Sequence, residues 1–343
     1  MMDPGEEGGG RSLYFGVLPA VSIMEAFDVD KTRILGRGEY GVVYAGTEKS
    51  TGVTVACKRS RKTPDLFMQR EASVLQRLKH PNIIRLLCSD VGVLVFEYAS
   101  TDLEQRIFQT SDALPIAQHM QQLLRGLAFM HQKGVVHRVS RACACLGRCA
   151  WRVSHPRPLP LLGVACPSPA QDLKPGNLLL TAAGQLKIAD FGLARPVRAA
   201  AEERPAKRAR PGPMSPHVVT LWYRPPEVLW GSTEYGCEVD MWSAGCVCAE
   251  MHLRARLFQG VSDIDQLGKI FHALGTPTEG SWPGHREMPC FVEWTECEGT
   301  PWGTILAGAQ AEPEPRWRTL IERALVLCPA RRITASEASE PGQ

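Results

Sequence analysis

Apolar and polar residues alternate along the first part of the chain, from FDVDKTRILGRGEYGVVYAG through TGVTVACKRS. Many of the apolar residues are β-branched, and turn-forming residues occupy Lys49 to Gly52, which predicts antiparallel strands. Thr63 and Pro64 then have the N-cap and first-turn pattern of a helix, and the apolar residues of DLFMQREASVLQRL recur near helical spacing. The segments NIIRLLCSD and GVLVFEYA return to a strand pattern.

The pattern changes after residue 100. IAQHMQQLLRGLAFMHQKG and most later segments have the spacing of helices, and 343 residues suffice for one large domain or two lobes. We therefore expect an α+β fold, with a small β-rich lobe at residues 24–99 and a larger helical lobe at residues 100–343, joined near Glu97 to Thr101. Residues 1–23, acidic and glycine-rich at their start, are expected to form a flexible N-terminal extension.

Two segments interrupt this order. Residues 139–171 contain five prolines, four arginines and four cysteines but no Asp, Glu or Lys, and residues 199–216 are rich in Pro, Ala and Arg. Neither composition is typical of a core. The stretch RPAKRARPGP in the second segment resembles a nuclear-import signal, although a solvated basic loop is the simpler interpretation.

Composition narrows the classes of function. Apolar residues make up 44% of the chain and charged residues 22%, and a formal net charge of +3 gives no argument for a nucleic-acid or membrane partner. The arginines also lack the interleaved aromatic residues of a nucleic-acid-binding surface. The N-terminus lacks the basic start of a signal peptide, no apolar run approaches the length of a membrane span, and the 12 cysteines are irregularly spaced. We expect reduced thiols and a protein of the nucleus or cytoplasm.

A glycine-rich motif, GRGEYGVV at residues 36–43, lies between two expected strands. Glycines let a backbone approach phosphates closely, but turns between strands also use them, and the position between strands argues against a dinucleotide-binding site. Lys58 follows on a strand, and Glu71 on the next helix could hold it toward a phosphate. A solvated lysine is the alternative.

Three further motifs follow in order: DLKPGN at residues 172–177, DFG at 190–192 and WYRPPE at 222–227. Together with the glycine-rich motif they resemble the signature set of the eukaryotic protein kinases, over roughly residues 28–336. VVTLWYRPPEVLW, SDIDQLGKIFHALGTP and LCPARRITASEA resemble the cyclin-dependent kinases, nearest to the kinase-activating and cell-cycle-related branches. The resemblance implies the two-lobed protein kinase fold and a proline-directed serine/threonine kinase that uses ATP and Mg²⁺ and acts on protein substrates.

The resemblance also assigns roles in ATP binding. Apolar side chains would hold the adenine, the backbone of Glu97 and Ala99 would bind its edge, and Asp102 would reach the ribose. Lys58, positioned by Glu71, would contact the α and β phosphates as part of the catalytic set. Each apolar residue taken singly also has a core-packing explanation. The full set implied for ATP is Leu35, Gly36, Gly38, Gly41, Val43, Ala56, Lys58, Phe96, Glu97, Ala99, Asp102 and Leu179.

The catalytic residues implied by the resemblance mainly orient groups and spread charge, because phosphoryl transfer needs little covalent help. Asp172 would accept the proton of the substrate hydroxyl, and Lys174 would neutralise the transferring phosphoryl group. Asn177 and Asp190 would hold Mg²⁺, which prefers oxygen ligands.

Arg70, Arg138 and Arg195 resemble the family's receiver for one phosphorylated residue of the activation loop. Guanidinium groups match phosphate geometry, so a shared phosphate could order the loop. The receiving position would be Ser215, which is followed by Pro216 and could be phosphorylated by a proline-directed kinase. A plain Ser-Pro turn is the alternative.

Two departures from the family pattern concern partners and packing. The short segment between Lys58 and Glu71 lacks the family's cyclin-recognition motif, so the need for a cyclin-like activator stays open. Cys328 replaces an acid of the family, while Arg332 remains as the expected buried partner of Glu227.

Residues 139–171 separate Arg138 from Asp172, which stand in for neighbours in the family. A translated intron accounts for this, because Val139-Ser140 can be encoded by a donor-like GTGAGC and Gln171 by an acceptor-like CAG. A regulatory loop and a cysteine metal site are the alternatives, although the cysteine spacing is poor for zinc. Two functions follow: an active kinase, or a catalytically impaired, kinase-like binding protein that holds nucleotide or partners without turnover.

Overall fold

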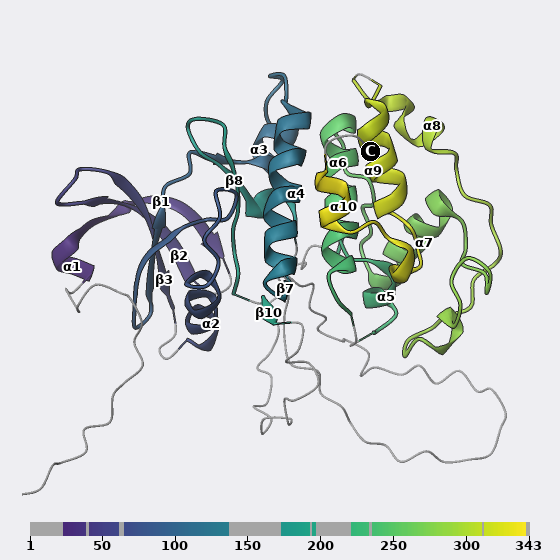
Figure 1. The fold of residues 1–343 in the computed structure, drawn as a ribbon, viewed down its shortest axis with the longest axis horizontal. Helices are drawn as coiled ribbons and strands as arrows, with labels where there is room; N and C mark the ends of the chain where they lie inside the picture. The colour runs from purple at the N-terminus through teal and green to yellow at the C-terminus, as the bar shows by residue number, and fades with distance from the viewer. Residues whose placement is uncertain are drawn as a thin grey trace, which may run out of the picture. The chain divides into compact units, whose positions relative to one another are not determined.

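The computed structural model describes residues 23–38, 41–61, 65–136, 173–192, 194–196, 221–232, 235–310 and 312–340 (Figure 1). These residues form two compact units. The first comprises the residues up to Asp65 together with Leu86–Tyr98, and the second comprises Leu66–Arg85 and the residues from Ala99 onward. The expected extension at residues 1–23, apart from Ile23, and the insertion at 139–171 lie outside the described residues.

The first unit is built on an antiparallel sheet, as the alternating sequence pattern predicts. Its strand order is β1-β2-β3-β5-β4. Gly52 and Gly92 have positive φ in the turns before β3 and β5, a conformation that glycine adopts without steric cost. The strands are β1 (Phe27–Gly38), β2 (Gly41–Glu48), β3 (Thr54–Ser60), β4 (Leu86–Asp90) and β5 (Val93–Glu97), and the short helix α1 (Ile23–Ala26) precedes them.

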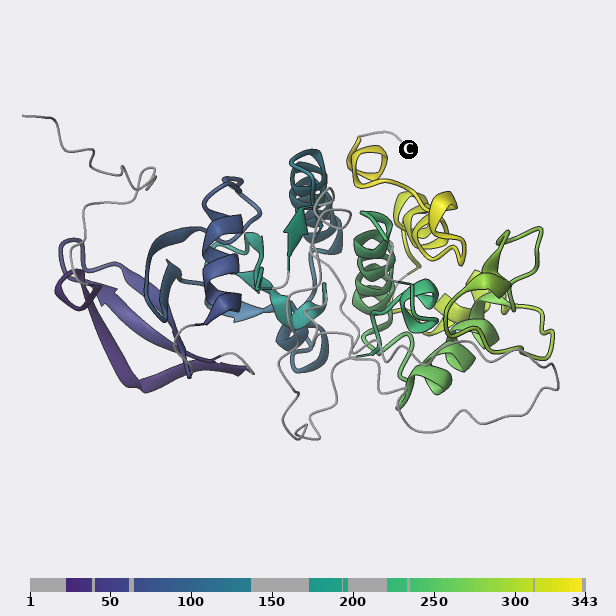
Figure 2. The same ribbon diagram turned by 90° about the horizontal axis from the view of Figure 1, so that it is seen from below.

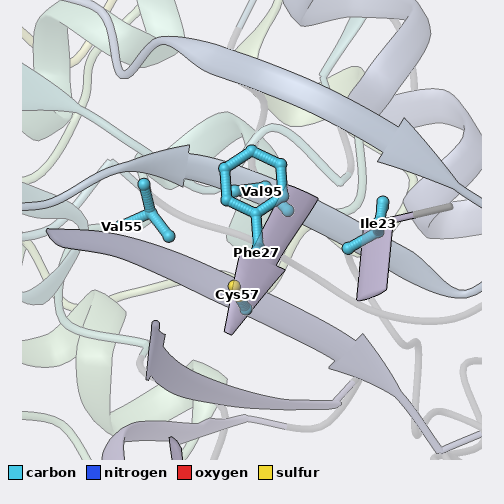
Figure 3. Close-up of a cluster of buried hydrophobic side chains, with 5 residues drawn as sticks. All are labelled: Ile23, Phe27, Val55, Cys57 and Val95. Carbon is cyan, nitrogen blue, oxygen red and sulfur yellow. The ribbon is translucent and has the colours of Figure 1, made fainter. Parts of the chain in front are cut away.

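One face of this sheet carries the core of the first unit. Successive strand residues point to opposite faces, so burial of Val55 and Cys57 on β3 sends Ala56 and Lys58 to the other face. The buried cluster, shown in Figure 3, consists of Ile23, Phe27, Val55, Cys57 and Val95.

The second unit is mainly helical, as the sequence predicts. It also contains a three-stranded sheet of order β6-β8-β9 and an antiparallel pair of β7 with β10. The short strands are β6 (Thr101–Asp102), β7 (Val135–Val136), β8 (Leu178–Leu180), β9 (Leu186–Ile188) and β10 (Arg195–Pro196). The α-helices are α2 (Leu66–Leu75), α3 (Leu103–Phe108), α4 (Ile116–Gln132), α5 (Pro226–Leu229), α6 (Glu238–Leu253), α7 (Asp263–Leu274), α8 (Trp302–Ile305), α9 (Pro315–Ala324) and α10 (Ala335–Ser339).

Helix α6 is central to the core of the second unit. Every residue from Val239 to His252 is buried, and the helix lies beside α4 and α9 in both views (Figures 1 and 2). A helix that is buried all round belongs to the interior of a large domain. In the part of the chain that the structure describes, no helix is long and apolar enough to cross a membrane.

Candidate active site

The hairpin of β8 and β9 places the two expected Mg²⁺ ligands near each other. Leu178 pairs with Ile188, and the backbone N–H of Ala189 donates to the carbonyl of Asn177 at 2.9 Å. Asn177 and Asp190 therefore lie at the same end of the hairpin. Asp190 has a φ of 65°, a left-handed conformation that is uncommon outside glycine and that Asp and Asn tolerate better than most residues. Backbone strain of this kind concentrates at functional sites.

The turn before β8 presents Lys174 between two buried anchors. Leu173 and Pro175 are buried, whereas Lys174 is half-buried. The 3₁₀ turn Pro175–Asn177 includes a hydrogen bond of 2.9 Å from the Asn177 N–H to the Lys174 carbonyl. The structure thus brings Lys174 into the same region as the expected Mg²⁺ ligands. Asp172, the expected proton acceptor, lies outside the described residues and directly precedes Leu173 in the chain.

Asp102 has a structural role that sequence reasoning missed. It is the N-cap of α3: its Oδ1 accepts from the backbone N–H of Gln105 at 2.9 Å and its Oδ2 from the Gln105 amide at 2.8 Å. Burial raises the pKa of Asp102, although these hydrogen bonds oppose the shift. An Asp followed three residues later by a Gln could have revealed this cap. Asp102 is also the Cα partner of Leu179, so two residues expected at the nucleotide lie opposite each other.

In the first unit, cross-strand pairing gathers four of the expected ATP residues on one face. Val43 is the Cα partner of Lys58, and Ala56 is the Cα partner of Phe96. Paired residues of antiparallel strands point to the same face, and so do Ala56 and Lys58, which are two apart on β3. These four residues therefore lie on the face opposite to the cluster of Figure 3. Leu35 lies at an irregularity in β1 and is 37% exposed.

The three glycines expected at the phosphates differ in what surrounds them. A Cβ on Gly41 would overlap the backbone carbonyl oxygen of Arg59, so the packing of β2 on β3 already requires glycine there. A Cβ on Gly36 or Gly38 would meet nothing within 4 Å, and neither residue has positive φ. The described neighbours therefore leave open space over Gly36 and Gly38, which suits the close approach of a phosphate.

The two residues of the expected ion pair, Lys58 and Glu71, belong to different units. Lys58 and Glu97 belong to the first unit, whereas Glu71 on α2 and Ala99 belong to the second. Glu71 is 2% exposed, and buried carboxylates are almost always paired. The pairing with Lys58 stays a prediction.

The three expected phosphate-binding arginines are described only in part. Arg195 on β10 pairs through its backbone with Val136 on β7, and Val136 precedes Arg138 by two positions in the sequence. Arg70 is half-buried on α2. Arg138, Ser215 and the side chain of Arg195 lie outside the described residues.

A buried ion pair that the sequence did not reveal supports the segment before Arg138. Nε2 of His131, at the end of α4, lies 2.9 Å from Oδ2 of Asp240 on α6. Burial opposes the charge of His131, but hydrogen bonds with Asp240 and Cys237 outweigh it and raise the pKa of His131 to about 9. The two partners are 109 positions apart, and no local pattern connects them.

The expected pairing of Glu227 with Arg332 is confirmed. Nη1 of Arg332 lies 2.6 Å from Oε1 of Glu227, and Nη2 lies 2.7 Å from Oε2. Both side chains are almost completely buried, and the Arg332 guanidinium also lies 4.9 Å from the ring centroid of Trp242.

Known proteins are similar to this chain over most of its length. The Protein kinase domain family matches residues 29–138 and 170–341. The chain is 36% identical over 322 residues to cyclin-dependent kinase D-1 of Oryza sativa subsp. japonica, a match that covers 90% of this chain and 65% of the rice protein. It is 36% identical over 334 residues to cyclin-dependent kinase 7 of Dictyostelium discoideum, covering 92% of this chain and 78% of that protein.

The chain therefore belongs to the protein kinase family and, within it, to the cyclin-dependent kinases. This confirms the resemblance inferred from the motifs and the α+β kinase fold. Protein kinases in general use ATP and Mg²⁺. The chain spans 65% of the length of the rice relative, less than two thirds, and residues 139–169 are unmatched by the family.

Proposed function

We propose that the chain transfers the γ-phosphoryl group of ATP to Ser or Thr side chains of proteins, at sites followed by proline. The observation that carries this proposal is the β8–β9 hairpin, which puts Asn177 beside the strained Asp190 and joins both to the turn of Lys174. Family membership and the ordered motifs add support.

The residues fit the two cofactors. Asn177 and Asp190 offer hard oxygen ligands for Mg²⁺, which usually binds one or two protein groups and completes its shell with phosphates and water. In the part of the chain that the structure describes, no group of three or more His, Cys, Asp or Glu side chains could hold a metal ion by itself. The face of Val43, Ala56 and Lys58 and the open space over the first glycines fit a nucleotide.

Bound ATP and Mg²⁺ supply the transferable phosphoryl group and the neutralisation of its charge. Asp172 accepts the proton of the substrate hydroxyl as the hydroxyl oxygen bonds to the γ-phosphorus and the bond from that phosphorus to the β-phosphate oxygen breaks, releasing ADP. Lys174 stabilises the charge that develops on the transferring group. Lys58, positioned by Glu71, orients the phosphates. Asp102 combines the cap of α3 with a contact to the ribose.

The test uses the chain without residues 139–171 and a peptide library in which Ser or Thr is followed by proline or by alanine. Phosphorylated products are identified by mass spectrometry. We expect Mg²⁺-dependent labelling of the proline peptides, lost by orders of magnitude in Lys58→Met and Asp190→Asn. The matched controls Lys269→Met and Asp112→Asn change two exposed residues and should stay active. Absence of transfer to every peptide, also with candidate cyclins present, would leave the binding-protein alternative.

That alternative is favoured by one observation, the unmatched residues 139–169 between Arg138 and Asp172. Closing a loop of this length costs only about 3 kcal/mol, so the fold tolerates it. Geometry is harder, because displacing a catalytic group by about 1 Å can lower the rate roughly a hundredfold.

We infer that residues 139–171 are translated intron, and that their removal restores HRDLKPGN and raises activity at least about tenfold. Mature transcripts that uniformly retain the segment, with full activity of the uncut chain, would contradict this.

The proposals for regulation and for an activating partner also rest on membership of the protein kinase family. We infer that phosphorylated Ser215 binds Arg70, Arg138 and Arg195 and activates the enzyme; equal activity of Ser215→Ala and phosphorylated protein would refute this.

The relatives are named as cyclin-dependent, and a cyclin-like activator is proposed here too. Addition of purified cyclins to the assay tests it. Microscopy of tagged protein tests residence in the nucleus or cytoplasm.

A further inference from the structure

Arg256, in the loop after α6, lies in a cluster that the proposed reaction does not use. Its guanidinium donates to Oε1 of Glu104 on α3 and to the hydroxyl of Tyr223. Its Nη1 lies 3.5 Å from Oε2 of Glu250 on α6. Only 16% of the Arg256 side chain is exposed. Two carboxylates from different helices therefore share one guanidinium.

Two aromatic rings complete the surroundings of this group. The guanidinium carbon lies 3.8 Å from the ring centroid of Phe108 and 5.0 Å from that of Trp222. Nε1 of Trp222 donates to the carbonyl of Gly260 at 3.0 Å, which fixes the indole. Carboxylates at the edge of a guanidinium and aromatic rings over its faces are the contacts that select this planar cation over an ammonium. The cluster has the composition of a guanidinium-binding site.

Glu250 supplies the buried carboxyl group of this cluster. Its side chain is fully buried, and it accepts hydrogen bonds from the Tyr223 hydroxyl at 2.7 Å and the Leu257 N–H at 3.1 Å. Burial raises the pKa of Glu250 to about 7, and these hydrogen bonds and Arg256 act against that rise. Removing the cation would leave this buried group either ionised without a counter-charge or protonated, and both states destabilise the fold.

Glu104 connects the cluster to the turn of Lys174. A Cβ on Gly176 would lie 2.6 Å from Oε2 of Glu104, so this carboxylate lies against the residue before Asn177. Glu104 is 41% exposed, so the cluster reaches solvent beside this turn. A protein substrate whose hydroxyl reacts beside Lys174 would pass close to the Arg256 cluster.

Hydrogen bonds of the nearby Arg254 hold the loop that contains Arg256 in place. The Arg254 guanidinium donates to the backbone carbonyls of Arg106, Ile107, Thr110 and Asp112, at and just after the end of α3. Arg254 also has a positive φ of 52° at the C-cap of α6. The direction in which Arg256 leaves the helix is therefore set by contacts other than its own.

We propose that Arg256 is a specificity-determining residue, whose guanidinium fills a guanidinium-binding site beside the turn of Lys174 and so keeps an arginine side chain of a protein substrate out of that site. The substrate part of this inference rests on the proposed kinase activity. The binding part does not, because it concerns only the cluster of Arg256, Glu104, Glu250, Phe108 and Trp222.

The binding part is tested by thermal denaturation of the full chain with ethylguanidinium, with ethylammonium at equal ionic strength as the control ligand. Arg256→Ala should melt at a lower temperature than the wild type, and millimolar ethylguanidinium should raise its melting temperature saturably by binding the vacated site. Ethylammonium should not. Arg286→Ala is the matched control variant, because Arg286 also pairs with a carboxylate, Glu293 at 3.2 Å, and lies 5.9 Å from the ring centroid of Phe291, but is 60% exposed.

The outcomes separate cleanly. A rise confined to Arg256→Ala, and abolished when Glu104→Gln is added, supports the site. Equal shifts in all variants, or no shift in Arg256→Ala, overturn it. If Arg256→Ala is unfolded, recovery of a folded protein in ethylguanidinium supports the site, and failure to recover refutes it.

The substrate part is tested with the chain lacking residues 139–171 and paired Ser-Pro peptides that differ only by one arginine, placed in turn at each position around the serine. Arg256→Ala should lower KM for one arginine peptide at least about tenfold relative to its arginine-free partner, with kcat little changed, and Arg256→Lys should do less. An unchanged KM ratio at every position would overturn the specificity claim. If neither wild type nor variant phosphorylates any peptide, the proposed function fails while the ethylguanidinium result still stands.

Discussion

Breaking the ion pair of Glu227 and Arg332 should strongly destabilise the second unit. The two side chains are 2% and 0% exposed, and the guanidinium also donates to the carbonyls of Val326 at 2.9 Å and Leu327 at 3.1 Å. Arg332→Met removes all of these bonds and leaves the carboxylate of Glu227 buried without a counter-charge. Removing one partner of a buried pair costs about 3–5 kcal/mol.

This loss is large compared with the total unfolding free energy of a domain. Domains unfold with a free energy of about 5–15 kcal/mol, so Arg332→Met would remove about a fifth of the stability or more. The matched control is Arg318→Met, which breaks the 3.1 Å contact with Glu322 on α9, where both side chains are about 40% exposed. Exposed pairs of this spacing contribute about 0.3–0.5 kcal/mol. The two arginine substitutions should therefore differ about tenfold in effect.

Urea denaturation followed by tryptophan fluorescence measures this difference, because Trp242 packs against the guanidinium of Arg332. The dependence of the unfolding free energy on urea should keep the same slope in both variants, so that midpoints can be compared. Glu227→Leu combined with Arg332→Met should be more stable than Arg332→Met alone, since no buried charge is left unpaired. A loss below about 1 kcal/mol for Arg332→Met, or a loss equal to that of Arg318→Met, would refute the reasoning.

Three further outcomes can be measured. The ion pair of His131 with Asp240 raises the pKa of His131 from 6.5 to about 9, so its stabilisation is complete below pH 6.5 and is lost as pH rises through about 9; His131→Asn should flatten stability over that range in denaturation curves. Gly41→Ala should destabilise the sheet, because the new Cβ meets a backbone carbonyl, whereas Gly38→Ala should leave stability unchanged and weaken ATP binding in calorimetry. Equal melting temperatures of the two glycine variants would contradict this. Phosphorylated Ser215 should raise kcat over Ser215→Ala in the peptide assay.

Much of the fold was predictable because the local spacing of apolar residues indicates which segments form strands and which form helices. The alternation from residue 27 to 60 predicted antiparallel strands, and those strands form; the helical spacing of residues 116–134 predicted the helix that the structure begins at Ile116. The ordered motifs also identified the kinase family, since each motif combines residue types that serve one chemistry. Even a long-range contact, Glu227 with Arg332, could be predicted where a motif specified both partners.

Contacts between distant residues that no motif specifies required the tertiary structure. His131 and Asp240 pair, and Arg256 joins Glu104 to Glu250, only because the packing of α3, α4 and α6 brings these helices together. The left-handed φ of Asp190 likewise depends on the hairpin around it. The sequence by itself determines which segments form strands or helices and which motifs carry the catalytic chemistry. Both depend on residues that are neighbours along the chain. Which charges are buried, and which cation neutralises each, is decided by packing, since burial depends on groups that are neighbours only in space.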